Sequence, residues 1–276
     1  MTTVRLSVVP ANRDGKVFDN PKFFRLPGAP DAMFYAIVPS TYSGQQTPLV
    51  LVHGISRNAI ELLCRFAPAA RLLGIPLIAP YFPTASYDQY QQVRSRKSGP
   101  QSDLTLLAIL DYVSVQFGVP ADRIDIFGFS GGAQFAHRFT FLHPEKVRTC
   151  IPVSAGWYTM PDPAKRWPYG LAGAPEALSS AAIRAVTFHV MVGRRDSLDD
   201  AALRRSPGLD RSQGTNRLAR ARNWFRAMQS WDVNAESSFT VLPRTRHSFE
   251  SAHRRGLGPL VFNLLGYPAT DSGEEN

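Results

Sequence analysis

The chain has 276 residues, of which 44% are hydrophobic and 19% charged, and its formal net charge is +9. This length and composition fit one large domain with a sizeable core, and no run of about eighteen apolar residues occurs, so we expect no membrane-spanning helix. No nucleic-acid recognition module accompanies the basic residues, so we expect no nucleic-acid partner.

The N-terminal residues do not contain the long apolar core of a secretory signal. The two cysteines, Cys64 and Cys150, lack metal-ligand spacing, and free buried thiols in a reducing compartment are the expected state of such a pair. These features favour a cytoplasmic location. The acidic and polar residues 271–276 are predicted to be a disordered tail, which leaves residues 1–270 as a single α/β domain.

Hydrophobic periodicity predicts alternating strands and helices along most of the chain. Residues 4–9 and 33–38 are expected to form an antiparallel edge of the sheet. Ser102 and Asp103 are expected to cap a helix, and the polar residues 84–100 to rim a site. Further strands are predicted at residues 49–52, 76–79, 124–127, 150–154, 185–192 and 239–243, and further helices from Asn58 and at residues 133–139, 215–230 and 251–265.

The five residues from Gly128 to Gly132 read Gly-Phe-Ser-Gly-Gly and join a predicted strand to a predicted helix. A Gly-x-Ser-x-Gly sequence in this position is typical of a tight turn that holds its serine in a strained conformation, with the hydroxyl exposed above the sheet. The residues two before and two after the serine must be very small, or their side chains would clash across the turn. Ser130 is therefore the predicted nucleophile.

A serine hydroxyl needs a base to take its proton and an acid to hold that base. With a serine turn of this type, the acid and the base follow in the chain in that order, each after a strand. The apolar run at residues 185–192 continues into Gly-Arg-Arg-Asp, which makes Asp196 the predicted acid. Asp199, Asp200 and Asp210 are rivals, for which a solvated loop or a helix start is the favoured interpretation.

His247 is the predicted base, because it lies between the last predicted strand and the last predicted helix. The other histidines fit less well. His137 and His143 lie on or after the helix of the serine turn, His189 lies inside a strand, and His253 lies in or near the final helix.

Backbone amides are expected to hold the negative oxygen that develops during acyl transfer. One donor is the amide of Gly131, directly after the serine. The strand at residues 49–52 runs into His53-Gly54-Ile55, where Gly54 permits a sharp turn and leaves the Ile55 amide as the second predicted donor. His53 precedes the serine, so we expect it to pin this loop by hydrogen bonds, with a role as catalytic base as the alternative.

With the His53-Gly54 loop, the serine turn, Asp196 and His247 in this order, the chain resembles the α/β-hydrolase superfamily over residues 49–265. The short strand-His-Gly loop makes it most similar to the esterase and polyhydroxyalkanoate-depolymerase-like branch. The resemblance implies an α/β fold with an eight-stranded, mostly parallel sheet and helices on both faces. It also implies hydrolysis of an acyl bond through an acyl-serine intermediate.

An irregular segment at about residues 157–182 separates two predicted strands and contains large aromatic residues among prolines. In the α/β-hydrolase fold this connection commonly carries a cap over the active site. We therefore expect Trp157 and Tyr158, together with Phe129 of the serine turn, to bind substrate, and Trp167 to belong to the same aromatic cap. The alternative is a surface loop anchored by buried aromatic residues.

Basic residues are concentrated between Arg194 and Arg226. On the predicted helix at residues 215–230, apolar residues recur every three or four positions, which should turn Arg220 and Arg226 towards solvent. Arg194 and Arg195 flank the predicted acid and are candidates for steering an anionic substrate.

The predicted function is that of a serine hydrolase that cleaves a carboxylic ester and needs no metal or organic cofactor. The expected partner is a small-molecule or oligomeric ester. A peptidase, a thioesterase or an acyltransferase would use the same triad, and a catalytically silent hydrolase fold would only bind a ligand.

Overall fold

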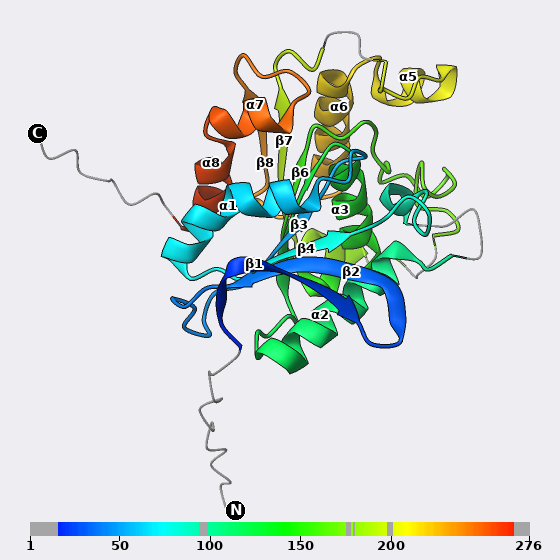
Figure 1. The fold of residues 1–276 in the computed structure, drawn as a ribbon. Coiled ribbons are helices and arrows are strands. Elements are labelled where there is room, and N and C mark those ends of the chain that lie inside the picture. Colours follow the sequence, from blue (N-terminus) through cyan, green and yellow to red (C-terminus); the bar gives the residue numbers. More distant parts are fainter. Residues whose placement is uncertain (1–15, 94–98, 175–177, 179, 198–200, 268–276) are drawn as a thin grey trace, which may run out of the picture.

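The computed structural model describes residues 16–93, 99–174, 178, 180–197 and 201–267. Its strands are β1 (Phe18–Leu26), β2 (Ala29–Val38), β3 (Leu49–Val52), β4 (Leu77–Tyr81), β5 (Ile124–Phe129), β6 (Val147–Val153), β7 (Thr187–Gly193) and β8 (Ser238–Leu242). They form one sheet in the order β1-β2-β4-β3-β5-β6-β7-β8 (Figure 1). β2 pairs antiparallel with β1 and β4, and all other neighbours are parallel.

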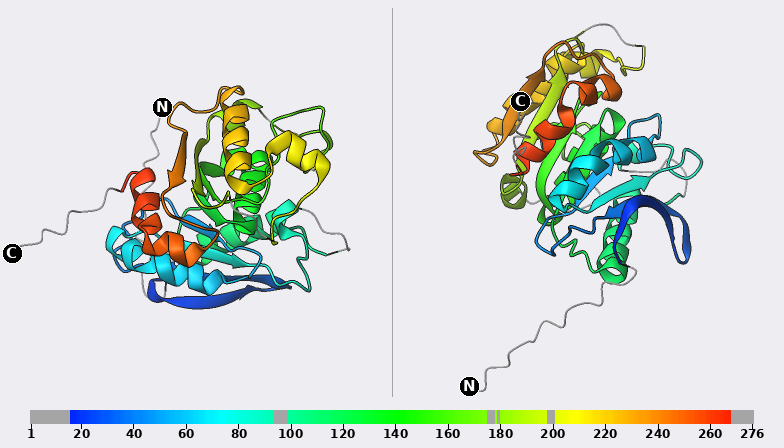
Figure 2. Two further views of the ribbon diagram at one scale, coloured as in Figure 1. Left: turned by 90° about the horizontal axis from the view of Figure 1, so that it is seen from above. Right: turned by 60° about the vertical axis from the view of Figure 1, so that its left-hand side comes forward.

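Helices cover both faces of this sheet, as Figure 2 shows. The helices are α1 (Ala59–Leu73), α2 (Ser102–Phe117), α3 (Gly131–Leu142), α4 (Ser180–Arg184), α5 (Pro207–Gln213), α6 (Arg217–Gln229), α7 (Phe249–Arg254) and α8 (Leu257–Leu264), with short 3₁₀ turns η1 (Tyr90–Gln92) and η2 (Pro144–Lys146). In one hydrophobic core, α1, α7 and α8 pack against the sheet. In the other, α2, α3, α4 and α6 pack against it. The predicted eight-stranded, mostly parallel sheet between two helical layers is confirmed.

The two cores follow from the twofold periodicity of the strands, which β3 illustrates. Leu49 and Leu51 belong to the core on the α1 side, whereas Val50 and Val52 belong to the core on the α2 and α3 side. All four side chains are 0% exposed. An uninterrupted apolar run of this kind is what a strand between parallel neighbours requires.

The outer antiparallel strand is β1, whereas the strand predicted at residues 4–9 lies outside the described residues. The sequence pattern does not reveal β1, because a register shift between Phe18 and Lys22 interrupts its alternation.

Two helix ends also differ from the prediction. Ser102 and Asp103 do not cap α2 but are its first two residues, and both are buried. Ser102 donates to the carbonyl oxygen of Tyr90, and Asp103 lies 3.0 Å from Nε2 of His143. The predicted C-terminal helix is divided into α7 and α8 at Gly256, which has a φ of 90°.

Cys150 is buried as expected, but Cys64 is exposed on α1, and both are free thiols. The predicted tail at residues 271–276 lies outside the described residues. None of the helices in the described part of the chain has the length and apolar character that crossing a membrane requires.

The segment that follows β6 folds back on itself without regular structure as far as residue 174. The amide of Met160 donates to the carbonyl oxygen of Tyr169 at 3.0 Å, and the amide of Trp167 donates to that of Ala172 at 2.8 Å. The segment is tied to α3, because the amide of Thr159 donates to Nε2 of the buried His137 at 3.0 Å. These bonds fix the part of the predicted cap that the structure describes.

Candidate active site

Ser130 lies in the turn between β5 and α3 and has a positive φ of 56°. A Cβ on Gly128 would lie 2.2 Å from the carbonyl oxygen of Gly132, and a Cβ on Gly132 would lie 2.0 Å from that of Val52. Only glycine fits at these two positions, as the sequence pattern predicts. The turn places the serine at the carboxyl edge of the sheet and at the N-terminus of α3.

The structure brings Ser130, His247 and Asp196 together from the ends of three strands. Nε2 of His247 lies 2.9 Å from Oγ of Ser130. Nδ1 of His247 lies 3.2 Å from Oδ1 of Asp196. Asp196 is 3% exposed, so its carboxylate is shielded from solvent, whereas His247 is partly exposed.

Backbone contacts join the loops that follow β7 and β8. The amide of Arg195 donates to the carbonyl oxygen of Thr245, and the amide of Arg194 to that of Leu242, both at 2.9 Å. A Cβ on Gly193 would lie 2.4 Å from the Thr245 oxygen. Glycine at the end of β7 therefore allows the loop of Asp196 to reach the loop of His247.

Phe129 supports the imidazole from the strand that leads to the serine. Its ring stacks on His247 with 5.3 Å between centroids and 28° between planes. The Phe129 ring also packs against that of Phe249, with 5.7 Å between centroids. Phe129 thus lines the cavity and packs against the His247 ring.

The amides of Gly131 and Ile55 lie next to each other beside Ser130. A Cβ on Gly131 would be 3.2 Å from the backbone nitrogen of Ile55. Within the described residues, neither amide donates to a backbone carbonyl. The two backbones therefore lie close together beside the serine, where the sequence predicts the two amide donors.

His53 holds the loop that presents the Ile55 amide. Its Nδ1 donates to the carbonyl oxygen of Gly54 at 2.8 Å, and its Nε2 accepts from the amide of Phe82 at 3.1 Å. Burial lowers the pKa of His53 to about 4, so the ring is neutral at neutral pH. Both ring nitrogens are occupied within the loop, which fits the expected pinning role and leaves neither nitrogen for Ser130.

A cavity of about 550 Å³ opens onto Ser130 and His247. Phe129 and Trp157, which the sequence predicts to bind substrate, line it. Tyr158 does not line it: its side chain is fully buried and stacks on Trp224 with 4.7 Å between centroids, so it belongs to the core. Trp167 also lies outside the lining and packs against the core instead.

Polar and basic residues form much of the remaining wall. Gln91 and Gln92 line the cavity, so the described part of the loop at residues 84–100 does rim the site. Arg204 and Arg217 line it as well, whereas the side chains of Arg194 and Arg195 are exposed outside the lining. Arg217 is 2% exposed, and its Nη1 lies 3.9 Å from Oδ1 of Asp196.

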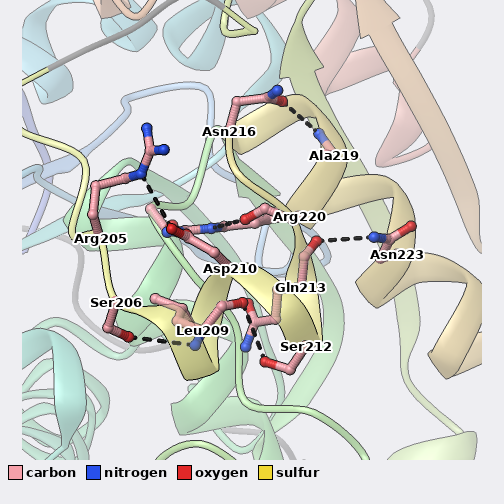
Figure 3. A network of polar contacts seen from close by, with 12 residues as sticks. Arg205, Ser206, Leu209, Asp210, Ser212, Gln213, Asn216, Ala219, Arg220 and Asn223 are labelled. Carbon is pink, nitrogen blue, oxygen red and sulfur yellow. Dashed lines mark hydrogen bonds and ion pairs between the residues drawn. The ribbon is translucent and has the colours of Figure 1, made fainter.

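Arg220 is fully buried, contrary to the expectation that it faces solvent (Figure 3). Its Nη2 pairs with Oδ1 of Asp210 at 2.6 Å, and its Nη1 donates to the carbonyl oxygen of Gly156, a cavity residue, also at 2.6 Å. The apolar stripe fails to predict this burial, because α5 and the segment after β6 cover a second side of α6. Arg226 is exposed, as expected.

The contacts of Arg220 also involve Asp210, one of the alternatives to Asp196 as the predicted acid. Asp210 is engaged with Arg220 and with Arg205, whose Nε lies 3.3 Å from it (Figure 3). Asp199 and Asp200 lie outside the described residues. Within the described ranges, no group of three or more His, Cys, Asp or Glu side chains is placed to hold a metal ion.

Searches of protein-family models and of curated protein sequences found no match. Among solved structures, the chain is similar to poly(aspartic acid) hydrolase-1 from Sphingomonas sp. KT-1, with a TM-score of 0.75 and 24% identity over 88% of this chain and 98% of that one. It is also similar to a poly(3-hydroxybutyrate) depolymerase from Bordetella parapertussis, with a TM-score of 0.71 and 22% identity over 84% of this chain and 85% of that one. The chain has the α/β-hydrolase fold.

A more distant α/β-hydrolase neighbour is an S-formylglutathione hydrolase from Agrobacterium tumefaciens, with a TM-score of 0.56 and 14% identity over 85% of this chain and 89% of that one. At these identities the likeness is one of fold. It confirms the architecture that the residues around Ser130, Asp196 and His247 suggest from the sequence.

Three residues of the site in this α/β-hydrolase fold are not singled out by the sequence. The hydroxyl of Tyr90 donates to the carbonyl oxygen of His53 at 2.7 Å, next to the loop of Gly54 and Ile55. Arg204 and Arg217 reach the cavity from the region of α5 and α6. Tyr90 could have been found from the sequence, because it lies in the polar loop that is predicted to rim the site. Arg204 and Arg217 could not, because many other arginines surround them in the sequence.

Proposed function

We propose that the protein is a serine hydrolase that cleaves carboxylic esters through an acyl intermediate on Ser130. The supporting observation is the unbroken series of contacts from Ser130 through His247 to Asp196, at 2.9 and 3.2 Å, beside a cavity of about 550 Å³. This arrangement is the one that a serine, a general base and an orienting acid need for acyl transfer.

In the first half-reaction, Oγ of Ser130 attacks the ester carbonyl while Nε2 of His247 takes the hydroxyl proton. Nδ1–H of His247 donates to Asp196, which holds the productive tautomer and stabilises the imidazolium. The carbonyl oxygen becomes an oxyanion, which the amides of Gly131 and Ile55 bind. When the tetrahedral intermediate collapses, His247 gives its proton to the leaving alcohol and the acyl group remains on Ser130.

In the second half-reaction, water replaces the alcohol. His247 takes a proton from the water as its oxygen attacks the acyl carbon, and the same two amides bind the new oxyanion. Collapse releases the carboxylic acid and returns the proton to Oγ of Ser130. Phe129 keeps the imidazole plane fixed through both steps, because its ring stacks on His247.

The same machinery serves thioesters, peptides and acyl transfer to an acceptor other than water. The neighbours in fold are named for poly(aspartic acid), poly(3-hydroxybutyrate) and S-formylglutathione, which supports hydrolysis in general without selecting one acyl bond. A non-catalytic binding protein is the alternative of a different class. It is disfavoured because a serine, a histidine and an aspartate all lie at reacting distances.

A fluorophosphonate probe tests the proposal directly, since it reacts only with an activated serine. We expect labelling of the wild-type protein at Ser130, identified by mass spectrometry, and none of the Ser130→Ala variant. Ser56→Ala is the matched control, because Ser56 also lines the cavity but has no hydrogen bond to a histidine among the described residues. A folded wild-type protein that is not labelled, or is labelled at another serine, would overturn the assignment.

Substrate class is tested with nitrophenyl esters of increasing acyl length, matched thioesters and a peptide nitroanilide. We expect turnover of esters, and a loss of roughly 10⁴-fold or more in Ser130→Ala, because the covalent route disappears. Faster turnover of the thioester would identify the protein as a thioesterase, and faster turnover of the anilide as a peptidase. Either result would still support Ser130 as the nucleophile.

A further inference from the structure

Arg204 lines the cavity that holds Ser130 and His247 and is held there by two aromatic rings. Its guanidinium carbon lies 5.6 Å from the ring centroid of Trp157 and 5.5 Å from that of Tyr169. The two rings stack on each other at 4.9 Å, and Nη2 of Arg204 donates to the Tyr169 hydroxyl at 2.6 Å. These contacts orient the exposed guanidinium along the wall of the cavity.

The guanidinium of Arg204 retains donors for a ligand. It has five N–H groups, and the Tyr169 hydroxyl takes one of them. Among the described residues, no carboxylate lies within 4.0 Å of Arg204. The adjacent Arg205 differs in this respect, because it pairs with Asp210 at 3.3 Å.

The acidic residues of the cavity do not offset this charge. Glu61 and Glu250 line the cavity, but each pairs with an arginine four positions along its own helix, at 3.0 and 3.6 Å. On the side of Arg204, a second guanidinium lies behind the same aromatic wall, since the buried Arg138 is 4.0 Å from the ring centroid of Trp157. The net charge of +9 adds a long-range attraction for anions.

We propose that Arg204, stacked on Trp157 and Tyr169, binds a carboxylate group of the substrate, so that the protein prefers esters that carry a negative charge on their acyl or alcohol part. The proposal rests on the serine hydrolase activity proposed above and names its substrate class. The planar fork of arginine matches the two oxygens of a carboxylate. One guanidinium also neutralises one unit of charge, which suits a carboxylate better than a phosphate monoester that carries nearly two at neutral pH.

The test compares charged and neutral esters of similar size. On the acyl side the pair is mono-4-nitrophenyl glutarate and 4-nitrophenyl pentanoate, and on the alcohol side it is 4-acetoxybenzoate and phenyl acetate. kcat/KM is measured for each with the wild-type protein, with Arg204→Gln, and with Arg222→Gln. Arg222 is a matched control because it is exposed on α6, lies outside the cavity lining and carries the same charge.

For at least one pair, we expect the wild-type protein to prefer the charged ester about tenfold, the effect of one hydrogen-bonded charge pair. The preference should disappear in Arg204→Gln and persist in Arg222→Gln. Arg204→Lys should keep part of it, since the charge remains but the planar fork does not. The pair that shows the preference identifies the side of the scissile bond that the subsite accepts.

Three results would overturn the subsite. The first is equal rates for charged and neutral esters in both pairs. The second is a preference for the charged ester that survives in Arg204→Gln. The third is an equal loss of this preference in Arg204→Gln and Arg222→Gln, which would point to long-range attraction alone. Absence of turnover together with absence of fluorophosphonate labelling at Ser130 would instead reject the hydrolase proposal, and the subsite with it. Turnover without charge preference rejects the subsite only.

Discussion

The carbonyl oxygen of Thr245 occupies the space into which a side chain on Gly193 would project, since a Cβ there would approach it to 2.4 Å. Gly193 ends β7 shortly before Asp196, and Thr245 comes shortly before His247. Contact between two backbones therefore sets the distance between Asp196 and His247.

Gly193→Ala should force these two loops apart and lower kcat/KM for a nitrophenyl ester by about 10- to 100-fold, because a displacement of about 1 Å is enough to misalign a catalytic pair. Gly208→Ala is the control, since an added Cβ there meets nothing within 4 Å. Thermal unfolding of both variants shows whether the fold persists. Equal activity in the two folded variants would contradict the role of the Gly193–Thr245 contact.

Asp196→Asn should reduce turnover by roughly 10⁴-fold, as removal of the acid does in a comparable triad, because the amide can present the wrong tautomer of His247 and no longer stabilises the imidazolium. Asp199→Asn and Asp200→Asn are charge-matched controls from the same stretch of chain and should retain most activity. Steady-state kinetics with one ester suffice. If Asp199→Asn or Asp200→Asn loses activity and Asp196→Asn does not, another carboxylate serves as the acid.

Trp157→Ala and Trp167→Ala should have different effects, because only Trp157 lines the cavity. Trp157→Ala is expected to change the order of kcat/KM across esters of increasing acyl length, while fluorophosphonate labelling of Ser130 continues. Trp167→Ala removes a ring that packs against the core, so it should lower the unfolding temperature and leave the order of substrates unchanged. The same shift in substrate order in both variants would show that the segment acts as one cap.

The stability of the protein should fall as the pH decreases from about 6.5 to about 4, in part through His53, whose pKa burial lowers from 6.5 to about 4. In this interval His53 is protonated in the unfolded chain but not in the fold, so the free energy of unfolding declines. The share of His53 in this decline is on the order of 3 kcal/mol. Above about pH 6.5 the contribution is constant. The loop of Ile55 is the part that this protonation disrupts, because Nε2 of His53 must accept from Phe82.

Urea unfolding of the wild-type protein and of His53→Gln, each at about pH 7 and about pH 4.5, measures this effect. The wild-type protein should lose more stability between these conditions than the variant. The buried His137, whose pKa is also lowered by burial, acts in the same direction in both proteins and cancels in the difference. An identical pH dependence in the two proteins would show that folding does not lower the pKa of His53.

The sequence predicts the elements whose signals are local. A serine between two obligatory glycines, an aspartate just after an apolar strand and a histidine between the last strand and helix each occupy positions that strand ends dictate. For that reason Ser130, Asp196 and His247 are found together where the sequence pattern predicts.

What the sequence pattern misses depends on packing between distant segments. Arg220 lies on the polar side of α6 by periodicity, yet it is fully buried, because Asp210 and the Gly156 carbonyl lie against it. Tyr158 adjoins Trp157 in the sequence, but the two rings point to different places, one to Trp224 in the core and the other to the cavity. Neither outcome follows from residue type or spacing.

A row of backbone hydrogen bonds crosses the sheet at the edge where the triad sits. The amide of Ser130 donates to the Val153 carbonyl and that of Ser154 to Met191, and the amides of Arg194 and Arg195 continue the row to the loop after β8. Exposing the amide of Ser130, Ser154 or Arg194 to solvent requires neighbouring strand ends to separate, whereas the bond from Arg195 to Thr245 joins two loops. The hydrogens of these three amides should therefore exchange with deuterium as slowly as those of the central sheet, which would make the edge beside Ser130 one of the last parts of the molecule to open.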